Sequence, residues 1–160
     1  MEEDINILIV DDNQENLKVV SNFLKDKGYN IALSLDGPGA LKILETDKID
    51  LILLDIMMPG MNGFEVCEKI RSNENTIDIP IIFLTAKNDT DDVVKGFQIG
   101  GVDYITKPFK KEELYARVST HVQLKRIRDW FRNEAERNLN SKYAFMRNLL
   151  DMGKIIDPNE

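Results

Sequence analysis

Reactive side chains follow four short apolar runs in the first 120 residues of this 160-residue chain. In chain order they are Asp11-Asp12, Asp55, Thr85 and Lys107. If the runs are strands of one parallel sheet, their carboxyl ends share an edge and the three carboxylates converge there. At about 4 Å and an effective dielectric of about 20, each like-charged pair costs about 4 kcal/mol. The cluster therefore needs protonation or a bound cation, and its oxygen ligands suit Mg²⁺ (or Mn²⁺).

The other two side chains extend this site toward phosphoryl chemistry. Lys107 adds a positive charge, and the Thr85 hydroxyl can donate a hydrogen bond to an anion. Phosphoryl transfer depends mainly on positioning and charge neutralisation, so one carboxylate would be the nucleophile. Taken singly, a helix cap, a strand-closing Thr and a Lys-Pro turn are ordinary structural features. Their combination at successive strand ends favours the functional interpretation.

Alternating strands and helices must position these residues. Strand-like runs are expected at residues 5–10, 30–35, 50–55, 80–85 and 102–106, with Lys107-Pro108 just past the last. The segments between them carry helix-boundary residues, namely Asn13, Gly28, Pro38, Asp89 to Asp92 and Gly100-Gly101. Five such repeats predict a doubly wound α/β fold with a parallel sheet and right-handed crossovers.

Six motifs together resemble one known family. They are Val10-Asp11-Asp12, Asp36-Gly37, Asp55-Ile56-Met57-Met58-Pro59-Gly60-Met61-Asn62-Gly63, Leu84-Thr85-Ala86, Gly101-Val102-Asp103-Tyr104 and Lys107-Pro108-Phe109. Residues 4–123 resemble the receiver domain of two-component response regulators of the chemotaxis type. The resemblance implies a flavodoxin-like, five-stranded parallel sheet of order 2-1-3-4-5. It also implies an expected division into a receiver at residues 1–123 and a helical extension or linker at 124–160.

The resemblance further implies a role for each polar residue. Asp55 would accept a phosphoryl group from the phosphohistidine of a histidine kinase or phosphotransfer protein. Asp12 and the Met57 backbone carbonyl would bind Mg²⁺ together with Asp55, and Asp11 would act mainly through a metal-bound water. Such a domain is a phosphoacceptor with slow autodephosphorylation and not a turnover enzyme.

The same resemblance assigns switch and structural positions. Lys107 would pair with the phosphoryl oxygens, Thr85 would move to hydrogen-bond them, and Tyr104 would rotate inward with Thr85. Structural roles fall to Pro59, Gly63 and Pro108, and the Lys107-Pro108 peptide is typically cis in this family. Phosphorylation would then alter the surface that a partner or an output domain recognises.

Other functions of a strand-end aspartate fit less well. A haloacid-dehalogenase-type phosphatase needs a second Asp two residues on as general acid, where this chain has Met57. Asp11-Asp12 would repel a flavin phosphate, and the chain has no P-loop. The single histidine, His121, lacks a kinase-like context and is expected at a helix surface or interface. Cys67 is expected to be a small core residue.

Composition limits the environment and the partners. The chain has a net charge of −7, with −9 in residues 1–120 and +2 in residues 121–160, which argues against binding nucleic acid through a basic surface. One cysteine excludes an internal disulfide. The acidic N-terminus does not resemble a signal peptide, and no run approaches the about 18 apolar residues of a membrane span. We therefore expect a cytoplasmic protein.

Residues 124–160 predict an amphipathic helix. Its apolar stripe has spacings of three and four residues and comprises Leu124, Ile127, Phe131, Ala135, Leu139, Tyr143, Met146 and Leu150. It is offset from the Leu114, Val118 and Val122 stripe by roughly a quarter turn, so it should face away from the receiver core.

The sequence leaves the partner of that stripe open: it could be a second copy of the chain, another protein, or a helix that folds back. A homodimer through the helix is favoured over binding to an anionic membrane surface, although residues 125–147 hold seven basic and three acidic side chains. The extension is too short for a DNA-binding output domain with its own core, so no direct DNA binding is expected. Alternatively, the chain is the N-terminal receiver of a larger hybrid kinase or output enzyme, and the extension is a signalling helix.

Overall fold

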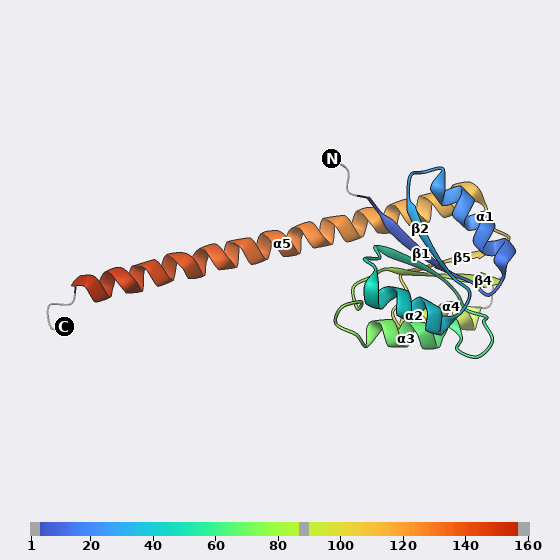
Figure 1. Cartoon of the computed structure of the whole chain (residues 1–160), viewed down its shortest axis with the longest axis horizontal. Coiled ribbons are helices and arrows are strands. Elements are labelled where there is room, and N and C mark those ends of the chain that lie inside the picture. Colours follow the sequence, from blue (N-terminus) through green and yellow to red (C-terminus); the bar gives the residue numbers. More distant parts are fainter. Residues whose placement is uncertain (1–3, 87–89, 157–160) are drawn as a thin grey trace. The chain divides into compact units, whose positions relative to one another are not determined.

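The computed structural model describes residues 4–86 and 90–156, with side chains up to residue 152. Its centre is one five-stranded sheet in which every neighbouring pair of strands is parallel. The strands are β1 (Asn6–Val10), β2 (Asn30–Ser34), β3 (Leu51–Asp55), β4 (Ile81–Ala86) and β5 (Asp103–Lys107). Their order, β2-β1-β3-β4-β5, confirms the predicted fold and places β3 at the centre. Figure 1 shows the strands as one layer, with α1 on one side and α2 and α3 on the other.

The predicted strand boundaries are correct to within one residue. The difference that matters is at the end of β5, where Lys107 is the last strand residue and does not lie past the strand. Lys107 is in register with Ala86, so the ladder continues one residue beyond the apolar run. Its backbone is therefore fixed by the sheet, and only Pro108 begins the connection.

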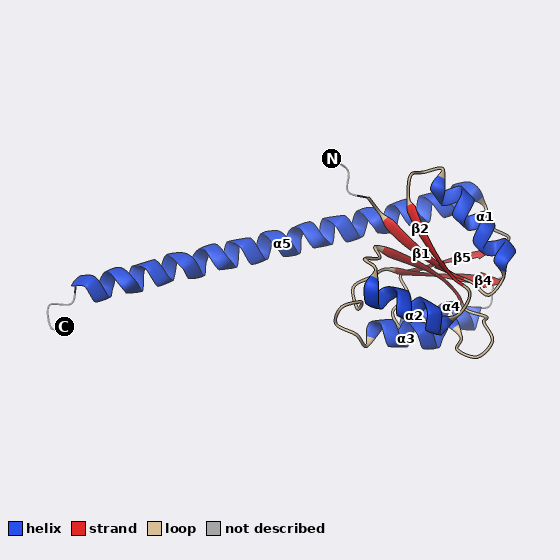
Figure 2. Ribbon diagram, viewed as in Figure 1, coloured by secondary structure: helices blue, strands red, loops and turns tan. Residues whose placement is uncertain are grey.

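Five helices cover the two faces of the sheet (Figure 2). They are α1 (Gln14–Lys25), α2 (Gly37–Thr46), α3 (Gly63–Arg71), α4 (Thr90–Gln98) and α5 (Lys111–Ile156). One buried cluster joins β-strand side chains to α2 and α3, and a second joins them to α1 and the first turns of α5. Central strand β3 is buried at all five positions, as expected for a strand covered on both sides.

The helix boundaries follow the predicted capping residues. Asn13 caps α1 by accepting hydrogen bonds from the backbone N–H groups of Glu15 and Asn16, and Pro38 lies in the first turn of α2. Gly28, just beyond α1, has a φ of 84°, which a glycine adopts without strain. Asp91 and Asp92 lie in the first turn of α4, whereas the predicted contribution of Asp89 lies outside the described residues.

The chain divides into two compact units, Met1–Lys125 and Arg126–Glu160. Within the first, Leu114, Val118 and Val122 of α5 are buried in the core. The described part of the second unit is the remainder of α5. Its large apolar side chains are more than half exposed at Trp130, Phe131, Leu139, Tyr143, Phe145 and Leu150. The predicted apolar stripe is thus exposed.

None of the helices in the described part of the chain is long and apolar enough to cross a membrane.

Candidate functional site

Three carboxylates meet at the carboxyl edge of the sheet. Asp11 follows β1, Asp12 is the next residue, and Asp55 ends β3, which pairs directly with β1. Their oxygen atoms lie within 4.8 Å of one another. Asp11 and Asp55 are buried, at 0% and 2% exposure, whereas Asp12 is exposed. The cluster therefore has two buried carboxylates and one that opens to solvent.

Lys107 supplies the positive charge for the buried pair. Its Nζ lies 3.2 Å from Asp11 Oδ2 and 3.1 Å from Asp55 Oδ1. Asp11 also accepts hydrogen bonds from the backbone N–H of Asn13, at 2.9 Å, and from Asn16 Nδ2, at 3.2 Å. Both Asp11 oxygens thus have donors within the protein. The sequence identified Asn13 only as a helix cap and missed Asn16.

The carboxylate of Asp55 has fewer hydrogen-bond donors around it than that of Asp11. Burial, and then the like charge of Asp11, raise its pKa from the ordinary 3.8 to about 6, although Lys107 acts in the opposite direction. The two donors that reach it, Lys107 and the Met57 backbone N–H at 3.3 Å, both contact Oδ1. Among the contacts of the described residues, Asp55 Oδ2 receives none. This oxygen is the one left for an incoming group.

The donor set fits a hard divalent cation. Three carboxylates carry three negative charges and Lys107 carries one positive charge, so a divalent ion makes the site neutral. Clustered carboxylate oxygens beside an exposed edge, with room for water, are the surroundings that Mg²⁺ prefers. The exposed Asp12 and the backbone after Asp55 give access from solvent.

The loop after β3 keeps the backbone close to Asp55. The Met57 side chain is 71% exposed, so any ligand role belongs to its backbone. Pro59 is exposed and precedes Gly60, whose φ of 75° turns the chain back toward α3. Gly63, the first residue of α3, is packed so closely that a Cβ would overlap the Asp55 carbonyl oxygen. Any side chain at 63 would displace the strand end that carries Asp55.

Thr85 and Tyr104 lie on one face of the sheet beside this edge. Asp55 is in register with Leu84, and Thr85 is the next residue, 3% exposed. Phe83 is in register with Tyr104 and Thr85 with Thr106, so Tyr104 and Thr85 are diagonal neighbours. Tyr104 is half-buried and contacts the Phe97 ring edge-on, with centroids 6.1 Å apart. The Lys107-Pro108 peptide is cis, as the resemblance implied.

A second charged network, which the sequence did not reveal, surrounds Asp103. Arg117 Nη1 donates to both Asp103 oxygens, at 2.9 and 3.1 Å, and His121 Nε2 lies 3.0 Å from Oδ2. His121 thus lies at a partly buried helix surface and contacts Asp103. Sequence spacing does not predict these contacts, because they join Asp103 on β5 to residues of α5 that lie 14 and 18 positions further along the chain.

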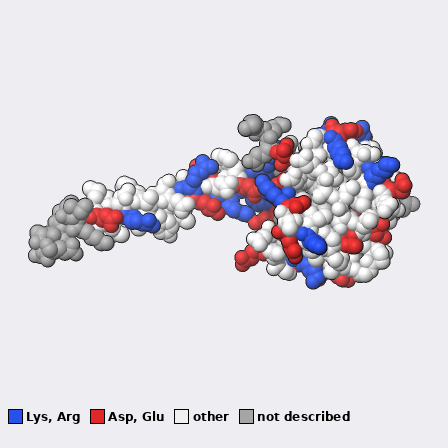
Figure 3. Space-filling view, viewed as in Figure 1, with Lys and Arg blue, Asp and Glu red and all other residues white. Residues whose placement is uncertain are grey.

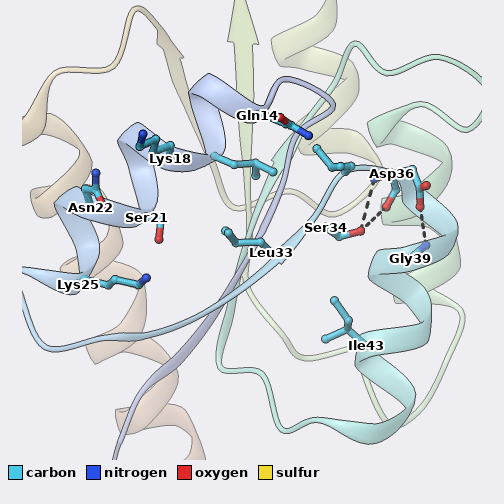
Figure 4. Close-up of a pocket in the computed structure, with 12 residues that line it drawn as sticks. Gln14, Lys18, Ser21, Asn22, Lys25, Leu33, Ser34, Asp36, Gly39 and Ile43 are labelled. Atoms are coloured by element: carbon cyan, nitrogen blue, oxygen red, sulfur yellow. Dashed lines mark hydrogen bonds between the residues drawn. The ribbon is translucent and has the colours of Figure 1, made fainter.

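Two other features are separate from the carboxylates. A groove of about 630 Å³ lies over β2 between α1 and α2, with Lys18, Lys25, Leu33 and Ile43 among its lining residues (Figure 4). Cys67 is fully buried, and burial raises the pKa of its thiol to about 11, which agrees with a core role. Basic and acidic side chains are interspersed on the visible face of the first unit (Figure 3).

Comparison with known proteins agrees with this geometry. The family described as "Response regulator receiver domain" matches residues 7–119. A Vibrio cholerae protein named "Probable cyclic di-GMP phosphodiesterase" is 45% identical over 128 residues, which are 80% of this chain and 29% of that protein. Response regulator PleD of Caulobacter vibrioides is 38% identical over 126 residues, 79% of this chain and 28% of that protein.

DNA-binding response regulator MtrA of Mycobacterium tuberculosis is 44% identical over 117 residues, 73% of this chain and 50% of that protein. The chain thus spans about half or less of the length of these relatives. All three relatives therefore have sequence beyond the matched part.

Solved structures show the same fold. Chemotaxis protein CheY4 of Vibrio cholerae superposes with a TM-score of 0.71 at 30% identity, over 74% of this chain and 98% of that one. A two-component response regulator from Clostridium difficile gives 0.69 at 33% identity, over 74% and 96%. Receiver domains accept phosphoryl groups at an acidic, Mg²⁺-binding pocket and interact with histidine kinases or phosphotransfer proteins. The sheet order, the carboxylates at its carboxyl edge and the match over residues 7–119 together show that this chain belongs to the response regulator receiver domain family.

Proposed function

We propose that Asp55 is the phosphoacceptor of this receiver. The observation that carries the proposal is the asymmetry of its carboxylate, because both donors contact Oδ1 and leave Oδ2 for attack. Oδ2 would attack the phosphorus of a phosphohistidine, forming the O–P bond while the P–N bond to the imidazole breaks. Because the transition state is loose and highly charged, the site contributes mainly positioning and positive charge.

The surrounding residues would have separate roles in this phosphoryl transfer. Asp12, Asp55 and the Met57 backbone carbonyl would hold Mg²⁺, with Asp11 acting through a metal-bound water. The bound ion supplies charge neutralisation at the phosphoryl oxygens. Lys107 already lies 3.1 Å from Asp55 Oδ1, so it can pair with a phosphoryl oxygen after a small displacement. Asp11 keeps its hydrogen bonds to Asn13 and Asn16 during that exchange.

We also propose that the side chains of Thr85 and Tyr104 change position when Asp55 is phosphorylated. A phosphoryl group raises the negative charge at Asp55 to about −2 and adds strong hydrogen-bond acceptors. Thr85 lies one residue beyond the partner of Asp55 on β4, so its hydroxyl can donate to one of those oxygens. Tyr104 would then turn toward the space that Thr85 vacates, which changes the surface formed by α4, β5 and α5.

Labelling with acetyl phosphate tests the acceptor assignment. Wild type should incorporate phosphate when Mg²⁺ is present and should not incorporate it when EDTA removes the ion. Asp55→Asn should abolish the labelling. Asp47→Asn, which neutralises an exposed carboxylate just after α2, is the matched control and should label normally. Undiminished labelling of Asp55→Asn would disprove the assignment.

For the part of α5 that begins at Leu124 we propose self-association. Leu124, Ala135 and Met146 are 11 residues apart, and this spacing of 3.67 residues per turn suits two long helices packed together. An isolated helix with so many exposed apolar side chains would gain stability by burying them in a second copy. Sedimentation should give a dimer for the full chain and a monomer for residues 1–123, and equal association states would exclude this partner.

The longer relatives support one further role for the second unit. Because the chain spans under a third of the phosphodiesterase-named protein and of PleD, an input domain joined by α5 to an output enzyme is a second candidate. We do not expect direct DNA binding by residues 1–120, because their net charge is −9. Fusion of this chain, through the end of α5, to a reporter output domain would test whether α5 can connect the receiver to an output enzyme.

A further inference from the structure

The charged network beside Tyr104 is built around one carboxylate. Asp103 accepts the Tyr104 backbone N–H at 2.9 Å and both hydrogen bonds from Arg117 Nη1. Arg117 Nε also donates to Glu113 Oε1, at 3.3 Å. The guanidinium is therefore held by two carboxylates, one of which belongs to the residue that precedes Tyr104. A planar guanidinium held in this way has lost most of its rotational freedom.

The held guanidinium faces the Tyr104 ring. Arg117 Cζ lies 5.9 Å from the ring centroid, within the range of a cation–π contact. On α4, Phe97 contacts the same ring edge-on at 82°. Tyr104 is thus fixed by Arg117 from α5 and by Phe97 from α4. Because Asp103 and Glu113 already hold the guanidinium, its contact with the ring needs little further ordering.

We propose that Arg117 is a positioning residue that holds Tyr104 in this location and opposes its movement toward Thr85. This inference rests on the proposed function, in which that movement accompanies phosphorylation of Asp55. Tyr104 and Thr85 are diagonal neighbours on one face of the sheet, so a ring that turns toward Thr85 moves away from the guanidinium. The contact therefore stabilises the unphosphorylated arrangement and sets how strongly the domain resists activation.

The expected size of this effect follows from population arithmetic. If the activated arrangement is the minor one, the apparent affinity for a phosphoryl group or its analogue is proportional to that minor population. Loss of one partly exposed cation–π contact should raise the minor population by about two- to fivefold. The affinity for beryllofluoride, an analogue of the aspartyl phosphate, should then rise by the same factor.

A double-mutant cycle on the full chain tests this coupling. The apparent dissociation constant of beryllofluoride with Mg²⁺ is measured by ¹⁹F NMR for wild type, Arg117→Ala, Tyr104→Ala and the double variant. Arg117→Ala should bind about two- to fivefold more tightly than wild type, but should cause no change in the Tyr104→Ala background. Arg117→Lys keeps the positive charge but not the planar guanidinium. Its dissociation constant for beryllofluoride should lie between those of wild type and Arg117→Ala. Tighter binding cannot result from partial unfolding, so a stability loss in Arg117→Ala does not mimic the effect.

The matched control is Arg137→Ala, which removes an arginine of α5 whose ion pair with Glu134 is exposed. Its beryllofluoride affinity should equal that of wild type. Unchanged affinity in Arg117→Ala, or an equal change in the Tyr104→Ala background, overturns the role of Arg117 while Asp55-dependent binding by wild type leaves the proposed function intact. If wild type does not bind, or Asp55→Asn binds equally well, the proposed function fails and this inference fails with it.

Discussion

Replacing Asp55 by Asn should stabilise the metal-free protein at neutral pH. The pKa of Asp55 is raised from 3.8 to about 6, first by burial and then by the neighbouring charge of Asp11. Above pH 6 the folded state must therefore hold an ionised carboxylate that the unfolded chain holds more easily. A difference of about two pH units corresponds to about 3 kcal/mol, so Asp55→Asn should raise the free energy of unfolding by up to that amount.

The size of this stabilisation depends on pH in a defined way. Below pH 3.8 Asp55 is protonated in both states and costs nothing, and the cost develops between pH 3.8 and about 6. Urea denaturation followed by far-UV circular dichroism, with EDTA, should show a large advantage of Asp55→Asn at pH 7.5 and a small one near pH 4. Asp47→Asn should show no such dependence. If Asp55→Asn were less stable than wild type at pH 7.5, or its advantage independent of pH, the electrostatic reasoning would be refuted.

Three further experiments test other parts of the first unit. Lys107→Met leaves Asp11 and Asp55 without their shared cation, so it should lower the free energy of unfolding at pH 7.5 by about 2–4 kcal/mol in urea denaturation, and Mg²⁺ should restore part of the loss. Gly63→Ala forces a Cβ against the Asp55 carbonyl oxygen. It should lower the melting temperature and slow labelling by acetyl phosphate. If both stay at the wild-type values, the loop after β3 can move to make room for the methyl group. The Cys67 thiol, buried and with a pKa of about 11, should react with Ellman's reagent at pH 8 only at the rate of unfolding; immediate reaction would mean that α3 opens locally.

The sheet was predictable because periodicity and burial agree along every strand. The apolar run of β3 is buried at all five positions, so neither its type nor its central place depends on long-range detail. The carboxylate cluster followed from the same regularity, since parallel strands bring their carboxyl ends to one edge. Lys107 was placed one residue too late because its backbone pairing with Ala86 continues after the apolar pattern stops.

The remaining contacts depend on side-chain directions that spacing does not encode. Asn16 lies on an amphipathic helix like any other polar residue, and only the orientation of α1 brings its amide within 3.2 Å of Asp11. The Asp103–Arg117 pair likewise depends on how α5 packs beside β5. A short polar side chain or a charged helix face has too many ordinary uses for sequence alone to select one.

The separation of Lys107 from its two partners along the chain has a consequence during synthesis. Asp11 and Asp55 leave the ribosome on strands that pair directly, whereas their counter-charge arrives with β5. At about 5–20 residues per second, about 3–10 s pass between residue 55 and residue 107. During this interval a nascent β1–β3 pair would bring two carboxylates together without compensation. The last strand therefore completes the sheet electrostatically as well as geometrically, because it brings the cation that Asp11 and Asp55 share.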